Sequence, residues 1–258
     1  MGSRGEPAET GASAQPEPSL VAVRDILIVV LAATSGYVDA VSYLGLGRVF
    51  TSNMTGNTVL LGLALGQAQG IAALRSLVAL AGYLCGVAAA TLIVEPKTTD
   101  KPSAIWPIGV TRAFAFECAV LLVFAVGGIL ARTADSASAI VYPLIALSAT
   151  AMGIQSVAVR ELGVSGITTT YITGTWTSLI GESVIRARSR LRPTRPATPA
   201  PARPHVRHVQ AAVLAVYVLA AVVGGLAESR WLLAAAVLPV VAVALVVAVA
   251  WRRFPRGG

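Results

Sequence analysis

The sequence predicts an all-α integral membrane protein with six to eight transmembrane helices in two homologous halves. Composition indicates the class, because 55% of the 258 residues are hydrophobic and only 12% are charged, whereas soluble domains average about 25% charged residues. The mean hydropathy is +0.74. Long apolar segments bound the number of helices, and a repeated polar motif indicates the two halves.

Residues 1–23 are rich in Pro, Glu, Ser, Gly and Ala. A segment of this composition buries too little apolar surface to fold, so we expect a disordered cytoplasmic tail. It does not resemble a secretory signal peptide, because it carries acidic residues instead of a compact basic cluster. The apolar segment that follows is therefore expected to remain as a transmembrane helix.

Eight apolar segments follow along the chain. Six of them reach the length of about 17–25 residues that a bilayer-spanning helix needs. The second and sixth reach it only if their polar, threonine-rich ends are counted, so six to eight spans are predicted. The segments are Ile26–Leu46, Thr58–Gln67, Gly70–Val94, Ile105–Ala131, Ala137–Val159, Ile167–Ile180, Val209–Ala227 and Trp231–Trp251.

A basic linker, residues 186–208, separates two of these segments and holds seven arginines and five prolines. The prolines exclude a continuous helix, and the positive-inside rule places the linker in the cytoplasm. Alternatively, the arginines form a surface that binds lipid head groups or a cytoplasmic partner. Nucleic acid is not expected as a partner, because no aromatic side chains lie between the arginines.

The cytoplasmic linker sets the predicted topology. Both termini, including residues 253–258, are then expected in the cytoplasm. Eight full spans satisfy this arrangement, and six spans with two re-entrant segments satisfy it equally. The distribution of Lys and Arg does not decide between them.

An internal repeat divides the membrane region into residues 24–131 and 132–252. A shift of 118 residues places Tyr43–Leu61 over Glu161–Leu179. Both halves also show the same order of one long, one short and two long apolar segments, which indicates a duplication. Identical pairs are Leu44/Leu162, Gly45/Gly163, Thr51/Thr169, Thr55/Thr173, Gly56/Gly174 and Leu61/Leu179.

The repeated stretch is polar and lies in the short apolar segment of each half. Short, glycine-interrupted segments at corresponding positions are typical of transporter sites built from interrupted helices. Hydroxyl and amide groups there can bind a solute, or they can join packed helices. The predicted solute-binding residues are Asn53, Thr55, Gly56, Asn57, Thr170, Thr173, Gly174 and Thr175.

The stretch Gly36–Gly62, GYVDAVSYLGLGRVFTSNMTGNTVLLG, resembles the signature of the YoaK-type family of bacterial membrane proteins of unknown function. The resemblance extends with lower specificity over residues 24–252. It implies a polytopic inner-membrane protein and supplies no activity. The matching residues are Gly36, Asp39, Ala40, Gly45, Phe50, Asn53, Met54, Thr55, Gly56 and Asn57.

Two acidic residues lie inside predicted spans, where a charge costs about 2.5–3.5 kcal/mol on insertion scales. Asp39 and Glu117 could each carry a coupling proton, and Asp39 is the better candidate for a coupling or substrate-binding charge. Alternatively, Glu117 pairs with Arg112 or with a donor on another helix, and Asp39 lies close enough to the interface to be hydrated.

Enzyme chemistry is not expected. Cys85 and Cys118 both lie in apolar segments, and His205 and His208 lie in the predicted linker, so no metal or cofactor site is indicated. No nucleophile, zinc or nucleotide motif is present. The sequence favours a secondary transporter or permease of a small solute. The alternative is a non-transporting interaction or scaffold protein that uses the arginine-rich linker, and the oligomeric state is left open.

Overall fold

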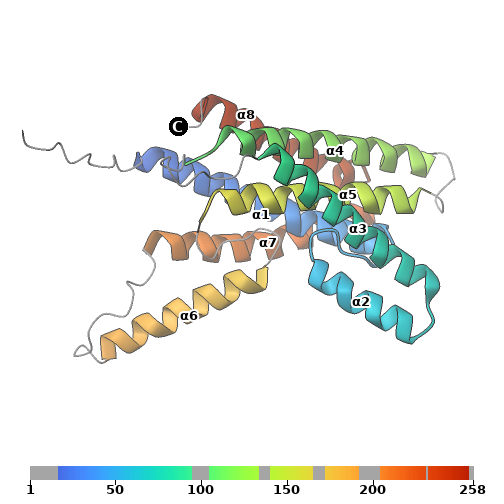
Figure 1. The fold of residues 1–258 in the computed structure, drawn as a ribbon, viewed down its shortest axis with the longest axis horizontal. Helices are drawn as coiled ribbons and strands as arrows, with labels where there is room; N and C mark the ends of the chain where they lie inside the picture. Colours follow the sequence, from blue (N-terminus) through green and yellow to red (C-terminus); the bar gives the residue numbers. More distant parts are fainter. Residues whose placement is uncertain are drawn as a thin grey trace, which may run out of the picture.

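The computed structural model describes residues 17–94, 105–133, 140–164, 172–191, 204–230 and 232–255, which form eight α-helices without strands (Figure 1). This confirms the all-α membrane class. Within these ranges, six helices are long and apolar enough to cross a membrane, and α2 and α6 are not among them. The helices are α1 (Pro18–Gly45), α2 (Met54–Gly66), α3 (Gly70–Ile93), α4 (Ile108–Thr133), α5 (Val141–Glu161), α6 (Ile172–Leu191), α7 (Pro204–Arg230) and α8 (Leu232–Arg253).

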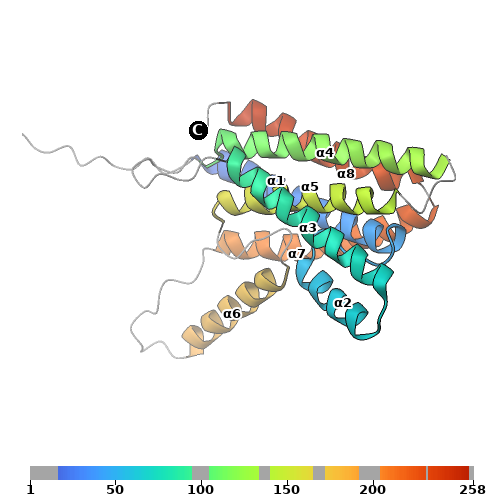
Figure 2. The ribbon, with the colours of Figure 1, turned by 45° about the vertical axis from the view of Figure 1, so that its right-hand side comes forward.

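The six long helices form one bundle. The start of α1, the start of α7 and the end of α8 lie at the same end of it (Figures 1 and 2). An even number of crossings returns the chain to its starting side, so both ends of the bundle's chain lie on one side of the membrane. That this side is the cytoplasm remains a prediction from the basic residues.

Helix α2 does not cross the bundle, because the chain folds back into the bundle before α2 begins. The backbone of Thr51 and Ser52 binds the side chain of Asp39, which lies six residues before the end of α1 at Gly45. Since a helix rises about 1.5 Å per residue, Thr51 and Ser52 lie about 9 Å back along α1 from its end. Helix α2 then runs outward to the end where α1 finished (Figure 1).

Helix α6 runs in the opposite direction. It begins beside the middle of α7 and extends toward the end of the bundle where α1 starts (Figures 1 and 2). Of the two topologies allowed by the sequence, this arrangement favours six spans with two re-entrant segments, which enter from opposite ends of the bundle.

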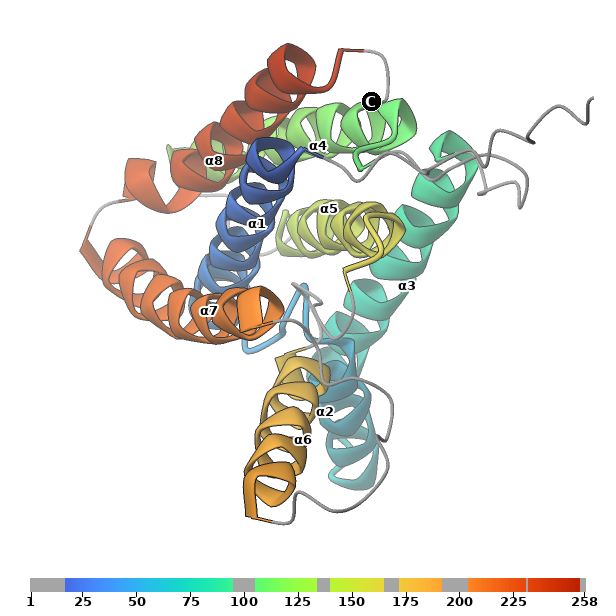
Figure 3. The ribbon, with the colours of Figure 1, turned by 90° about the vertical axis from the view of Figure 1, so that its left-hand side faces the viewer.

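The long helices pair closely across the two predicted halves. Helix α1 packs along α7, and α3 packs along α5 (Figure 3). Glycines permit this approach: a Cβ on Gly36 would clash with the carbonyl of Tyr217, and one on Gly153 with the carbonyl of Tyr83. A Cβ on Gly82 would lie 2.7 Å from the carbonyl oxygen of Ala146. These helices therefore touch backbone to backbone.

An aromatic cluster closes the end of the bundle where α4 starts and α8 ends. The rings of Trp106 and Phe254 stack with centroids 5.4 Å apart, and Phe114 lies 5.8 Å from Trp106. The indole of Trp106 donates a 2.8 Å hydrogen bond to Thr111. All of these side chains are buried, so they fix the end of α8 against α4.

Helix ends differ from the predicted segments at several places, and α1 already begins at Pro18 instead of Ile26. Helix α2 begins at Met54 instead of Thr58, because the Asn53 side chain caps it. Helix α6 continues to Leu191 and α7 begins at Pro204, where proline is favoured in a first turn. The predicted linker, residues 186–208, therefore overlaps a helix at each side, and His205 and His208 are helical. Of the tail predicted over residues 1–23, residues 1–16 lie outside the described ranges, and residues 18–23 form the first turns of α1.

Candidate functional site

Asp39 anchors the re-entrant segment that precedes α2. Its Oδ1 accepts hydrogen bonds from the backbone N–H groups of Thr51 and Ser52, at 2.9 and 2.7 Å. Its Oδ2 accepts from the hydroxyls of Ser52 and Tyr217, at 2.5 and 2.7 Å. The side chain is buried. Four donors on one carboxylate stabilise its charge and satisfy backbone groups that a lipid environment would leave unpaired.

Three hydroxyls continue this polar cluster. Ser42 and Thr51 exchange a hydrogen bond at 3.0 Å, and Ser148 of α5 donates to Thr51 at 3.0 Å. All three residues are buried. The segment is therefore tied to α1, α5 and α7 at once.

Asn57 holds the same segment from the other side. Its Oδ1 accepts from the N–H of Phe50 at 3.0 Å, and its Nδ2 donates to the carbonyl of Phe50 at 2.5 Å. The ring of Phe50 stacks on Tyr43, with centroids 5.0 Å apart. Because Asn57 is fully buried and both of its polar atoms bind backbone, it acts as a structural clamp in this conformation.

A pocket of ≈ 280 Å³ lies where the starts of α2 and α6 meet the middle of α7. It contains four of the predicted binding residues, three from the first motif and one, Thr173, from the second. The lining residues are Asn53, Thr55, Gly56 and Val59 of the first half, and Ile172, Thr173 and Tyr217 of the second. Residues far apart in the sequence thus share one cavity. That it binds a solute stays a prediction.

The hydroxyls of Thr55 and Thr173 are available in this pocket. Neither donates a hydrogen bond to any residue in the described part of the chain, whereas Thr58 and Thr177 bind helix carbonyls four residues earlier, at 2.9 and 3.0 Å. Asn53 uses its Oδ1 to accept from Gly56 at 3.1 Å. The pocket therefore offers hydroxyl, amide and phenol groups, and no charged side chain is among the described residues that line it.

Other predicted site residues lie elsewhere. Thr175 is fully buried in α6 and does not line the pocket, and neither does Gly174. Glu117 lies in α4, away from the pocket. Thr170 falls outside the described residues. Asp39 does not line the pocket either, but its hydrogen bond with Tyr217 connects it to the pocket wall.

Tyr217 is the site residue that the sequence analysis missed. It lies in the apolar run AAVLAVYVLAAVV of α7. A phenol in the middle of an apolar span needs a hydrogen-bond partner, so its position in the sequence indicated a polar contact. Nothing in the local sequence identified Asp39 as the partner, because the two residues are 178 positions apart.

A related tyrosine contact occurs between α3 and α5. The hydroxyl of Tyr83 donates to Ser156 at 2.7 Å, and Ser156 lies three residues after Gly153, which packs on the Tyr83 carbonyl. Asp39 likewise lies three residues after Gly36, which packs on Tyr217. Both helix pairs therefore use the same glycine–tyrosine arrangement, with an acid in one and a hydroxyl in the other.

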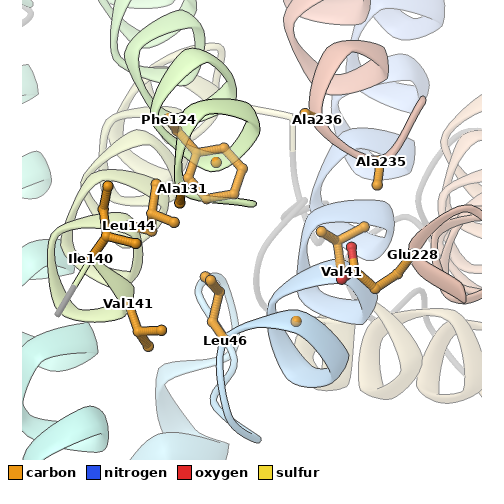
Figure 4. Close-up of a pocket in the computed structure, with 12 residues that line it drawn as sticks. Val41, Leu46, Phe124, Ala131, Ile140, Val141, Leu144, Glu228, Ala235 and Ala236 are labelled. Atoms are coloured by element: carbon orange, nitrogen blue, oxygen red, sulfur yellow. The ribbon is translucent and has the colours of Figure 1, made fainter. Parts of the chain in front are cut away.

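A second pocket, of ≈ 100 Å³, lies at the end of the bundle where α1 and α4 finish (Figure 4). Its wall is apolar apart from Glu228, and includes Val41, Leu46, Phe124 and Leu144. It contains none of the predicted binding residues and is too small for most solutes. We therefore place the candidate site in the polar pocket.

Comparisons with known proteins agree with the membrane fold. A family model described as "Protein of unknown function (DUF1275)" matches residues 27–250. The UPF0700 transmembrane protein YoaK of Bacillus subtilis (strain 168) is 44% identical over 161 residues, which cover 62% of this chain and 68% of that protein. No solved structure matches the chain.

Proposed function

Since the chain belongs to the DUF1275 family, whose description gives no activity, we propose a function from its site: a secondary transporter or permease of a small polar solute. The solute would bind in the pocket between α2, α6 and α7. The observation that carries the proposal is that Thr55 and Thr173, from corresponding motifs, face one cavity with unused hydroxyls.

The surrounding architecture supports this proposal. Non-helical backbone at membrane depth is tolerated where it is buried in protein or lines a cavity. Here the segment around Ser52 is held by Asp39 and leads into a pocket beside the middle of α7. Two short helices that enter from opposite ends are an arrangement suited to alternating access around a fixed site.

Hydroxyl chemistry suggests how a solute would be recognised. A threonine hydroxyl donates one hydrogen bond and accepts others, so Thr55 and Thr173 can match donors and acceptors on the solute. The phenol oxygen of Tyr217 donates to Asp39 and keeps lone pairs that can accept from the solute. Val59 and Ile172 supply apolar contact.

The proposal is tested by thermal-stability screening of the purified protein against a library of small solutes, followed by uptake into vesicles. Thr55→Val and Thr173→Val remove a hydroxyl and keep the side-chain volume. Each variant should weaken solute affinity about tenfold, because an unmet polar group costs about 1–3 kcal/mol. Their unfolding temperatures without solute should stay close to that of the wild type.

Thr58→Val and Thr177→Val are matched controls, because these hydroxyls bind their own helices outside the pocket. They should leave affinity and uptake unchanged. If no solute raises the unfolding temperature and no uptake is found, the transport proposal fails and the scaffold alternative is favoured. Equal losses of affinity in all four variants would also contradict the assignment of this pocket as the solute-binding site.

A further inference from the structure

Glu117 lies on the fully buried face of α4, far from the ends of the helix. Phe114 and Leu121, one turn to either side, are also fully buried. They belong to an apolar core that includes Met152 of α5 and Val243 of α8. Glu117 is therefore fully buried on a helix face that packs into the apolar core of the bundle.

Neither carboxyl oxygen of Glu117 has a hydrogen-bond partner in the part of the chain that the structure describes. Arg112, the partner considered from the sequence, is exposed on the same helix. Glu117 also takes part in no ion pair among those residues. This absence of any partner separates it from the other buried carboxylates of the described helices, Asp25, which pairs with Arg24 and His205, and Asp39.

In the described parts of the helices that pack on α4, the charged residue of α3 is Arg75, whose guanidinium lies beside the turn at Gly47. Helix α5 has no titratable side chain over residues 143–159, and α8 has none over residues 235–250. In α3, the Tyr83 hydroxyl binds Ser156 and Cys85 is exposed. The titratable neighbour is Cys118 on α4 itself, whose thiol donates to the carbonyl of Val240 at 3.8 Å.

The contrast with Asp39 assigns the two acids different roles. Asp39 accepts four hydrogen bonds and can keep its charge. Among the described residues, a charged Glu117 would have neither a donor nor a cation to stabilise it, so this surrounding favours the neutral carboxyl over the carboxylate.

We infer that Glu117, rather than Asp39, is the proton-carrying residue of the transport cycle, so that the proton is the coupling ion. This inference rests on the proposed function. In the step itself, the O–H bond of the carboxyl breaks, the proton passes to a water molecule, and a carboxylate remains. Reprotonation from water on the other side of the membrane restores the neutral acid.

A proline in the neighbouring helix α8 marks the place where this inference puts the access of water to Glu117. Pro239 interrupts α8 from within and has no N–H, so the carbonyl of Ala235 lacks its helical donor. The thiol of Cys118 contacts the next residue, Val240. Helix α8 can bend at this level, which would open the contact between α4 and α8 beside Glu117.

Infrared difference spectroscopy of the full-length protein in lipid vesicles tests the inference without any solute. The wild type should show the carbonyl band of a protonated carboxylic acid, shifted in D2O and lost reversibly as pH rises. Glu117→Gln should abolish the band, Glu117→Asp should move it, and Asp39→Asn should leave it in place. The Asp variant serves if the Gln variant fails to fold.

Three results would overturn the inference: no such band in the wild type, a band that survives Glu117→Gln, or a band that neither exchanges in D2O nor titrates. The last would make Glu117 a permanently neutral structural acid. Once a solute is identified, Glu117→Gln should keep solute exchange and lose its acceleration by a pH gradient. A titrating band without any solute uptake would retain the proton site and refute the transport function.

Discussion

The hydroxyl of Tyr217 in α7 donates a 2.7 Å hydrogen bond to the buried carboxylate of Asp39 in α1. The same tyrosine lines the polar pocket, and the same carboxylate holds the backbone of Ser52. One side chain thus connects the wall of the candidate site with the anchor of the re-entrant segment. A substitution of either residue should therefore alter both the pocket wall and the anchoring of the re-entrant segment.

Removing this hydroxyl should cost more than removing its counterpart in α3. Tyr217→Phe should lower the free energy of unfolding by about 1.5–3 kcal/mol, because hydrogen bonds to charged groups are the stronger class. Tyr83→Phe removes a bond of equal length to the neutral Ser156 and should cost about 0.5–1.5 kcal/mol. Reversible unfolding in mixed detergent measures both, and equal losses would contradict a charged Asp39.

The two asparagines of the first motif should separate stability from binding. Asn57→Ala leaves the N–H and carbonyl of Phe50 unpaired in the interior, and should cost about 2–3 kcal/mol. Asn53→Ala removes only a helix cap, and should cost about 1 kcal/mol. Because Asn53 lines the pocket, its variant should also weaken solute binding. Thermal unfolding that is equal in the two variants would refute the clamp.

Close helix packing should make three glycines intolerant of a methyl group. Gly36→Ala, Gly86→Ala and Gly153→Ala each place a Cβ against a backbone carbonyl of the facing helix, so each should cost about 2 kcal/mol or more. Gly66→Ala is the control, since nothing lies within 4 Å of its added Cβ. Unfolding temperatures of the four variants check the prediction, and a tolerated Gly36→Ala would mean that α1 and α7 are not in backbone contact.

Topology is checked by single cysteines introduced into a chain that lacks Cys85 and Cys118. With six spans and two re-entrant segments, a cysteine at Gln69 should be labelled from the periplasm and one at Thr99 from the cytoplasm. Positions near Gly2, Ala197 and Gly258 should be labelled from the cytoplasm. Eight full spans would exchange the results at Gln69 and Thr99, and periplasmic labelling near Ala197 would reverse the whole orientation.

Apolar length predicted the membrane class and bounded the number of helices. It did not distinguish a short span from a re-entrant helix, since Met54–Gly66 is apolar in both cases. The difference depends on where the chain turns, and that is set by the bonds of Asp39 to Thr51 and Ser52. Such contacts join positions 12 and 13 residues apart and have no periodic signature.

The polar motif predicted the location of the pocket better than the role of each residue. Asn53 and Asn57 stand one helical turn apart, yet one lines the pocket and the other is buried against Phe50. Identity alone does not separate these roles, because an amide can bind backbone or solute equally well. Likewise, Asp39 and Glu117 looked alike as acids in spans, and only the donors around them distinguish the two.

Helix pairing across the two halves has a consequence for how the protein is made. Helix α1 packs along α7, and α3 packs along α5. During synthesis, α1 and α3 therefore enter the bilayer before α7 and α5 have been made. Until α7 is inserted, Asp39 lacks the hydrogen bond from the hydroxyl of Tyr217. A ribosome stalled after α4 would leave an assembly intermediate whose glycine faces are uncovered. Such a fragment should be a target for membrane quality-control proteases, and the chain becomes resistant only once α7 has been inserted.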